Sequence, residues 1–225
     1  MEHIFVKISI MLVPALLAVT VHEVAHGYVA DKFGDPTARL LGRLTLNPVR
    51  HLDPVGTLAL LFVGFGWARP VPVNFANLRN PKKNMLWVAL AGPFANLVLA
   101  LGSALLLHGV GFAVATLPFD VSIVAKPIAL MAAFSLYINI ILAVFNLVPI
   151  PPLDGGRVLS ALLPARQAAI LARIEPFGFM LVIVLVFFTD IWSKVLGPII
   201  LSLVALLAGQ HVGVVGDVIN FLFRG

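Results

Sequence analysis

The chain has 225 residues, of which 60% are hydrophobic and only 11% charged, and its formal net charge is +5. Soluble domains carry about 25% charged residues, so most of this surface must face lipid, and the dispersed basic residues argue against a nucleic-acid partner. The absence of cysteine excludes disulfides, thiolate zinc sites and cysteine nucleophiles. In chain order, the apolar runs predict an all-α polytopic membrane protein.

The first apolar segment, residues 4–30, is long enough to cross a membrane. A helix rises about 1.5 Å per residue, so roughly 20 residues cross a hydrocarbon core of about 30 Å. Pro14 lies inside this segment, where a membrane helix tolerates proline but bends at it. We therefore expect a transmembrane helix with a kink.

The second half of this segment contains His22, Glu23 and His26. Side chains four residues apart lie above one another on one face of a helix, so the two imidazoles can hold one zinc ion. The glutamate after the first histidine then lies beside the open position of the metal, where it can accept a proton from water. The alternatives are a packed pair of polar histidines and a carboxylate that only orients one of them.

Residues 32–83 are more polar, and proline and glycine are frequent among them. We expect short extended segments at 40–46 and 70–75. Between these, residues 55–67 are apolar but too short and too rich in glycine to span comfortably. The sequence therefore predicts a re-entrant or β-hairpin segment between the first two transmembrane helices.

Four further apolar runs predict transmembrane helices, at 85–107, 127–148, 177–188 with its flanks, and 195–208. Together with the first segment they make about five spans, or six if residues 55–67 also cross. Residues 109–125 are expected to form a connector. Because no internal repeat and no separable soluble region is visible, we expect residues 1–225 to form a single membrane-embedded domain.

The distribution of basic residues predicts the orientation of the spans. With an external N-terminus, twelve of the fifteen lysines and arginines fall on the inside and three on the outside. The first and third spans then both run from outside to inside. His22 and His26 lie near the inner end of the first span, and Asp154 follows the inner end of the third, so all three arrive on one side of the membrane.

A catalytic zinc site takes three protein ligands and leaves a fourth position open. The candidates for the third ligand are His51, Asp53, His108, Asp154, Glu175 and His211. Asp154 is favoured, ahead of His51, because three prolines precede it and two glycines follow it, a pattern that breaks a helix and aims one carboxylate inward. The alternative for Asp154 is to cap the short helix that follows.

Three motifs resemble, in order, those of the site-2 protease family of membrane-embedded zinc metalloproteases: HEVAH at 22–26, AGPFAN at 91–96, and NLVP with LDGG between 146 and 156. The likeness is to the compact form of that family, without PDZ or CBS domains. It covers roughly residues 4–160. Three motifs in order are far more specific than the first one alone.

The resemblance implies that His22, His26 and Asp154 bind one Zn²⁺ and that Glu23 is the general base. Asn146 matches the asparagine that helps to stabilise the oxyanion. From the residues alone, an interhelical hydrogen bond is the alternative for Asn146.

The predicted function is therefore that of an intramembrane zinc metalloprotease, a hydrolase that cleaves peptide bonds in or near transmembrane segments of membrane proteins, as in regulated intramembrane proteolysis. The single protease domain would have its catalytic core at 4–160 and additional transmembrane helices at 174–209. Its partners would be a transmembrane protein or peptide substrate and the lipid bilayer. We expect a multi-pass protein of a prokaryotic cell (inner) membrane, with its active site towards the cytoplasmic side.

Two other functions place polar residues in membrane helices. A metal-handling membrane transporter would usually show repeated halves with matching broken helices, and no such symmetry is visible. A non-catalytic relative that binds membrane helices would have no need of the general base Glu23. Both readings are therefore weaker than the protease.

Overall fold

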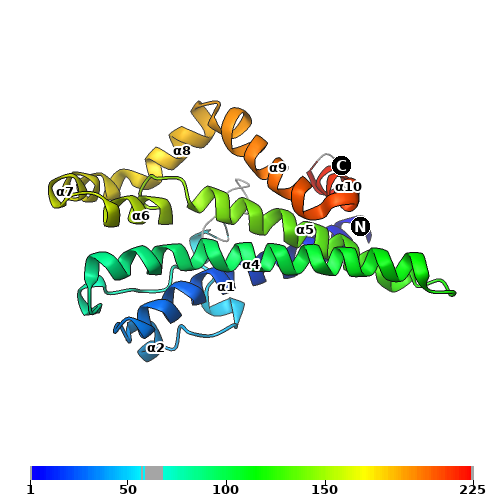
Figure 1. Cartoon of the computed structure of the whole chain (residues 1–225), viewed down its shortest axis with the longest axis horizontal. Coiled ribbons are helices and arrows are strands. Elements are labelled where there is room, and N and C mark those ends of the chain that lie inside the picture. Colours follow the sequence, from blue (N-terminus) through cyan, green and yellow to red (C-terminus); the bar gives the residue numbers. More distant parts are fainter. Residues whose placement is uncertain (1, 57, 59–67, 224–225) are drawn as a thin grey trace. The chain divides into compact units, whose positions relative to one another are not determined.

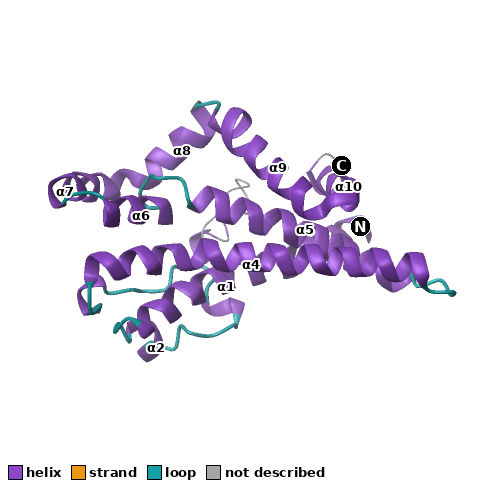
Figure 2. Cartoon of the chain, in the orientation of Figure 1, coloured by secondary structure: helices purple, strands orange, loops and turns teal. Residues whose placement is uncertain are grey.

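The computed structural model describes residues 2–56, 58 and 68–223. Figure 2 shows this part of the chain as helices joined by loops, with no strand in it. The α-helices labelled in Figure 1 are α1 (Glu2–Lys32), α2 (Thr37–Leu40), α4 (Pro81–Thr116), α5 (Ser122–Asn146), α6 (Asp154–Leu162), α7 (Ala165–Ile174), α8 (Gly178–Phe188), α9 (Gly197–Ala208) and α10 (Val212–Phe223). Short 3-10 helices lie at Pro48–Arg50, Phe75–Asn77, Glu175–Phe177 and Gly209–His211, and a π-helical turn lies at Trp192–Leu196.

Five helical stretches in the described residues are long and apolar enough to cross a membrane: Val6–Lys32, Pro81–Thr116, Ser122–Asn146, Ala165–Phe188 and Trp192–Leu222. The prediction of an all-α polytopic fold with about five spans is confirmed. The last two stretches each join several consecutive helices. The chain is a multi-pass membrane protein.

The expected connector at 109–125 is mostly helix. α4 continues to Thr116 and α5 begins at Ser122, so only a short loop separates them. Within lipid, a backbone that leaves a helix has N–H and C=O groups without hydrogen-bond partners. The free energy cost of these unpaired groups outweighs the weak helix preference of glycine. Gly111 instead makes room for a neighbour, because a Cβ there would lie 2.3 Å from Cε1 of His211.

The predicted re-entrant segment at 55–67 falls almost wholly outside the described residues. Next to it, Leu52 and Ala68 form an isolated antiparallel bridge, and Arg69 N donates to His51 O at 2.8 Å. The segments expected to be extended, 40–46 and 70–75, form no strand in the part of the chain that is described. Prolines in the second of them remove the N–H groups that a ladder requires.

The described helices form two compact units. One comprises Met1–Ala18, Asn96–Val144 and Asp190–Gly225, and the other Val19–Ala95 and Phe145–Thr189. α1, α4 and α5 contribute residues to both. The expectation that residues 1–225 act as a single domain stays a prediction.

In the first unit, buried polar side chains satisfy one another. Asn96 Nδ2 donates to Asn139 Oδ1 at 2.8 Å and to Ala18 O at 3.2 Å. Asn139 Nδ2 donates to Ser135 O at 2.8 Å, and the hydroxyls of Ser103 and Ser135 are bonded at 2.8 Å. Because apolar surroundings offer no water, polar residues on membrane helices are bound by their neighbours. Asn96 and Asn139 therefore pack helices together.

In the second unit, the buried carboxylate of Asp35 secures the loop between α1 and α4. It accepts hydrogen bonds from Asn74 N at 2.7 Å, Asn77 Nδ2 at 2.9 Å and Thr37 N at 3.2 Å, and from the Thr37 hydroxyl. Asp35 follows the end of α1, so these bonds attach residues 74–77 to that end. The segment just before residue 74 leads past the histidines of α1.

The Asp35→Asn substitution tests this attachment. Burial alone would raise the pKa of Asp35, but hydrogen bonds from Thr37, Asn77 and Asn74 outweigh burial and hold that pKa below its usual value. The stabilisation is complete above the ordinary pKa of 3.8 and is lost as the pH falls towards the lower pKa of the folded state. We expect the variant to lose about 2 kcal/mol near neutral pH, since an amide cannot accept at both atoms. Thermal unfolding in detergent should show that the difference in stability between wild type and variant disappears at acid pH. A difference in stability that does not depend on pH would contradict this account.

Candidate metal centre

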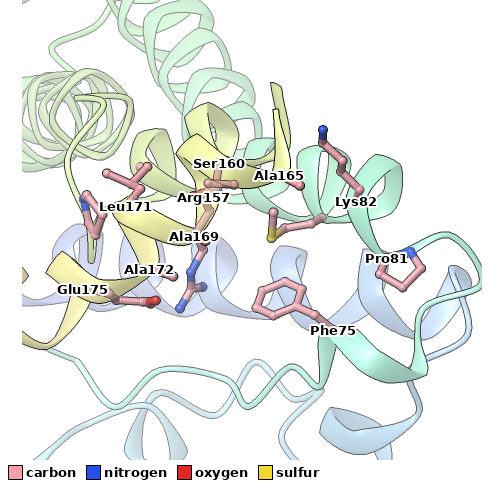
Figure 3. A pocket seen from close by; sticks show the side chains of 14 residues that line it. Phe75, Pro81, Lys82, Arg157, Ser160, Ala165, Ala169, Leu171, Ala172 and Glu175 are labelled. Carbon is pink, nitrogen blue, oxygen red and sulfur yellow. The ribbon is translucent and has the colours of Figure 1, made fainter. Parts of the chain in front are cut away.

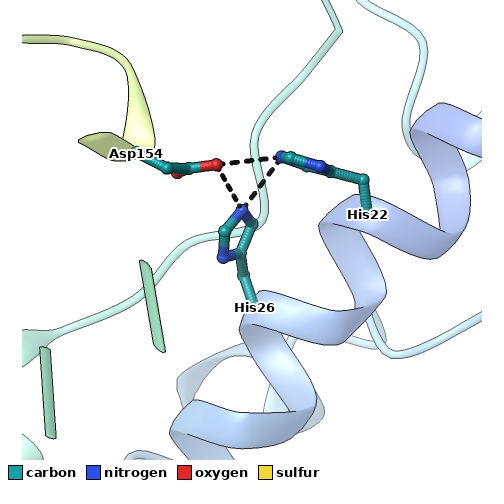
Figure 4. Close-up of side chains that lie close together, drawn as sticks. All are labelled: His22, His26 and Asp154. Atoms are coloured by element: carbon teal, nitrogen blue, oxygen red, sulfur yellow. Dashed lines mark hydrogen bonds and ion pairs between the residues drawn. The ribbon is translucent and has the colours of Figure 1, made fainter. Parts of the chain in front are cut away.

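Two elements bring three potential metal ligands together in the second unit. His22 and His26 lie one turn apart on α1, and Asp154 is the first residue of α6. Figure 4 shows the three side chains pointing towards one another. The two Nε2 atoms are 3.0 Å apart, and Asp154 Oδ2 lies 3.2 Å from each of them. All three residues are buried. Within the described residues, they form the group of histidines and carboxylates that can hold a metal ion.

The arrangement fits a zinc ion. A tetrahedral ion with bonds of about 2.0–2.2 Å holds its ligand atoms roughly 3.3 Å apart, close to the separations seen here. His26 Nδ1 lies 2.7 Å from Val88 O, so this nitrogen carries the ring proton and Nε2 presents a lone pair. Asp154 Oδ2 is buried and receives no hydrogen bond from the described chain. Electron pairs that face one another in a buried space are stabilised by a cation between them.

The two glycines after Asp154 allow the proline-rich loop to fold back across the start of α6. A Cβ on Gly155 would lie 2.3 Å from Leu147 O, and one on Gly156 would lie 2.4 Å from Pro151 N. Any side chain at either position would displace this loop. The predicted break in the helix is therefore present, and it directs the carboxylate of Asp154 towards α1.

The backbone of α4 closes the other side of the two imidazoles. A Cβ on Gly92 would lie 2.3 Å from His26 Nε2 and 2.6 Å from His22 Cε1. One turn earlier in α4, the carbonyl of Val88 holds His26 Nδ1. The helix thus needs glycine at position 92 to approach the histidines and orient one of them.

Glu23 is held from the loop between α1 and α4. Its Oε2 accepts a hydrogen bond from Val71 N at 2.8 Å. The residue is half-buried and directly follows His22 in the chain. The contact fixes the orientation of the carboxylate and ties residues 69–74 to α1.

The other candidate ligands are not members of this group in the described chain: His51, Asp53, His108, His211 and Glu175. His51 is buried with Nε2 2.9 Å from Thr45 O, and Asp53 Oδ1 accepts from Gly56 N at 2.8 Å. Both bonds support a turn. His108 and His211 stack edge to face in the first unit, with ring centroids 5.0 Å apart.

α6 does not use a side chain as its cap. The helix begins at Asp154 itself, and the preceding Leu153 makes no side-chain cap bond. Asn146, the last residue of α5, is half-buried, and its part in the site stays a prediction. Sequence motifs also could not reveal Val71 and Val88, because they act through backbone atoms.

A groove of about 400 Å³ lies between α6, α7 and the start of α4 (Figure 3). Its lining is mostly apolar, with Lys82, Arg157 and Glu175 as the charged members. The Arg157 guanidinium lies 5.6 Å from the centroid of the Phe75 ring. Lys82 Nζ donates to Leu163 O at 2.7 Å, which ties the start of α4 to the end of α6. The groove holds none of the three metal ligands.

Comparison with known proteins shows the family to which the chain belongs. The profile of peptidase family M50 matches residues 10–189, which include all three ligands and Glu23. The chain belongs to peptidase family M50, the site-2 protease family. No solved structure matches it.

Several curated proteins are similar to this M50 chain. It is 43% identical over 195 residues to "Putative zinc metalloprotease YwhC" of Bacillus subtilis, covering 84% of this chain and 85% of that protein. It is 34% identical over 178 residues to "Putative zinc metalloprotease Rip2" of Mycolicibacterium smegmatis, covering 76% and 63%. Similarity to "Zinc metalloprotease MJ0392" of Methanocaldococcus jannaschii is 27% over 158 residues, covering 70% and 35%.

Family and fold together identify the chain as a membrane metalloprotease, a hydrolase with zinc as its metal. The predicted family, enzyme class and cofactor are confirmed. The individual roles of the site residues are proposals, taken up below.

Gly92→Ala should abolish zinc binding, because the added Cβ meets both imidazoles. Metal content of the purified protein measures the effect. Gly102→Ala is the matched control on the same helix, since a Cβ there meets no atom within 4 Å. Full zinc content in Gly92→Ala, or equal loss in both variants, would contradict the close approach of α4.

Proposed function

We propose that this M50 peptidase hydrolyses peptide bonds in or near transmembrane segments of other membrane proteins. The main support is the position of the candidate metal centre, because two of its ligands lie on a helix long and apolar enough to span the membrane. Water-soluble substrates do not enter the membrane and would not reach a site on such a helix. A membrane-embedded segment reaches it by diffusing within the bilayer.

In this proposal His22, His26 and Asp154 hold the zinc ion. Zinc, when bound, supplies a Lewis acid that activates water and polarises the scissile carbonyl. Glu23 accepts the proton of the attacking water as the new C–O bond forms, and it delivers a proton to the leaving amine as the C–N bond breaks. The hydrogen bond from Val71 N keeps the carboxylate of Glu23 in one orientation during both transfers.

We assign Asn146 the stabilisation of the oxyanion. It ends α5, just before the proline-rich loop that leads to Asp154, and both residues belong to the same compact unit. A well-placed amide donor typically contributes about 3 kcal/mol to such a transition state. The support is its motif position before the proline-rich loop.

The loop segment beside Glu23 offers a place for the substrate backbone. A substrate helix hides its peptide bonds in internal hydrogen bonds, so it must unwind before attack. Pro70 and Pro72 have no N–H, and Val71 N–H is bound by Glu23. Val73 N–H finds no acceptor in the described chain, and we infer that an unwound substrate pairs with it as an added strand.

The same proposal includes an orientation. The excess of basic residues in the loop between α1 and α4 favours the cytoplasmic side for this end of α1. The similar proteins come from bacteria and an archaeon. We therefore place the protein in a prokaryotic cell membrane, with its active site towards the cytoplasm.

Glu23→Gln tests the reaction most simply. The amide keeps the size of the side chain but cannot take a proton, so cleavage of a helical membrane substrate should fall by about 10²–10⁴-fold while zinc content is retained. Cleavage is followed by gel or mass spectrometry of a tagged transmembrane peptide, with zinc measured on the same preparation. Undiminished cleavage in this variant would refute the role given to Glu23.

Val73→Pro tests the substrate edge. Proline removes the free N–H, so cleavage of a helical substrate should drop while zinc binding is unchanged. Val73 also packs against the cluster of Ala30, Leu78 and Val88, so Val73→Ala is the control that loses the packing but keeps the N–H. Equal activity of the proline and alanine variants would dispose of strand addition at this residue.

A further inference from the structure

The loop between α1 and α4 contains a hollow of about 580 Å³ that holds none of the three candidate metal ligands and not Glu23. Arg43, Arg50 and Arg69 line it, together with apolar and proline residues. No acidic side chain is found in its lining among the described residues. We call it the arginine hollow.

Arg43 is the buried member of the arginine hollow. Only 8% of it is exposed, and its Nη2 donates to Arg69 O at 2.9 Å and Pro70 O at 3.3 Å. Its Nε is buried and finds no partner in the described chain. Burial and the nearby charges of Arg69 and Arg50 lower the pKa of Arg43, while Glu23 acts in the opposite direction. A buried cationic donor without an acceptor is unfavourable, and a bound anion relieves it.

An exposed apolar fringe belongs to the same loop as the arginine hollow, and two of its members, Leu41 and Val49, line the hollow. Its members lie outside the spanning helices and are each more than half exposed: Leu40, Leu41, Leu46, Val49 and Val55. The loop that carries them packs on α1 at Gly27, where a Cβ would lie 2.7 Å from side-chain atoms of Leu44 and Val71. Gly27 is five residues before the end of α1 at Lys32, which is about 7.5 Å along the helix. The loop that carries the fringe therefore packs near the end of the first spanning helix.

We propose that the arginine hollow binds the phosphate of an anionic phospholipid headgroup, with the apolar fringe inserted among the acyl chains. Guanidinium groups bind phosphate oxygens in pairs, and Arg43, which lines the hollow, has an Nε donor with no partner in the described chain. Apolar residues beside basic ones are the combination that binds an anionic membrane surface. Free phosphate or an acidic peptide would leave the fringe in water, so lipid is the ligand that uses both features.

The test is lipid binding to the full chain in non-ionic detergent, measured by native mass spectrometry during titration with phosphatidylglycerol or phosphatidylcholine. Wild type should bind phosphatidylglycerol in preference. Arg50→Gln/Arg69→Gln should weaken that binding roughly tenfold or more and leave phosphatidylcholine unaffected. Both side chains are exposed, so the variant should fold, and zinc content with thermal unfolding checks that it does. The single variants should each lose part of the affinity.

Arg166→Gln/Arg173→Gln is the matched control, because it removes two exposed arginines from α7 outside the hollow. It should bind phosphatidylglycerol as wild type does. Equal loss in both double variants would show a bulk charge effect and overturn the site, as would undiminished binding by Arg50→Gln/Arg69→Gln.

Two competitors distinguish the sources of the anion. Displacement of the lipid by inorganic phosphate at equal concentration would show a free-phosphate site, and displacement by a soluble acidic peptide would show a protein ligand; either overturns the lipid proposal. The expected result is that neither competes. The measurement of lipid binding does not involve proteolysis. The lipid proposal can therefore fail while the proposed protease function holds, and the protease function can fail while the lipid proposal holds.

Discussion

The structure depends on holding three electron-pair donors 3.0–3.2 Å apart inside an apolar protein. Two imidazoles and a carboxylate at that spacing repel or lose solvation unless a cation lies among them, and a membrane segment offers no water to replace it. A zinc ion bound here would therefore stabilise the packing around it as well as supply the chemistry proposed above. The elements around the centre each meet this requirement in a particular way.

Small residues and backbone atoms position the donors. Gly92 lets α4 reach the histidines, and Val88 O fixes the tautomer of His26. Gly155 and Gly156 let the proline-rich loop fold back so that Asp154 begins α6 facing α1. Glu23 is oriented by Val71 N–H from a loop that Asp35 holds to the end of α1. The three candidate ligands are thus held by groups that are not themselves candidate ligands.

Local signals and chain direction were enough to predict which three side chains lie together in the structure. The four-residue spacing fixes His22 and His26 on one face of a helix. The break made by prolines and glycines indicates Asp154, and the number of predicted spans puts this residue on the same side of the membrane as the histidines. Contacts made by Val71 and Val88 were not predictable, because a backbone N–H or C=O leaves no trace in the residue type. The connector expected at 109–125 was wrong because α4 continues to Thr116 and α5 begins at Ser122, since opening a helix in lipid leaves backbone groups without partners.

The most direct test of the account is X-ray absorption at the zinc edge of the wild-type protein and of Asp154→Asn. Wild type should show two imidazole nitrogens and a carboxylate oxygen among its ligands at about 2.0–2.2 Å. The variant should lose the carboxylate contribution and bind zinc more weakly, because the third protein ligand is gone. Identical spectra and equal zinc affinity in the two proteins would contradict a centre built from α1 and α6.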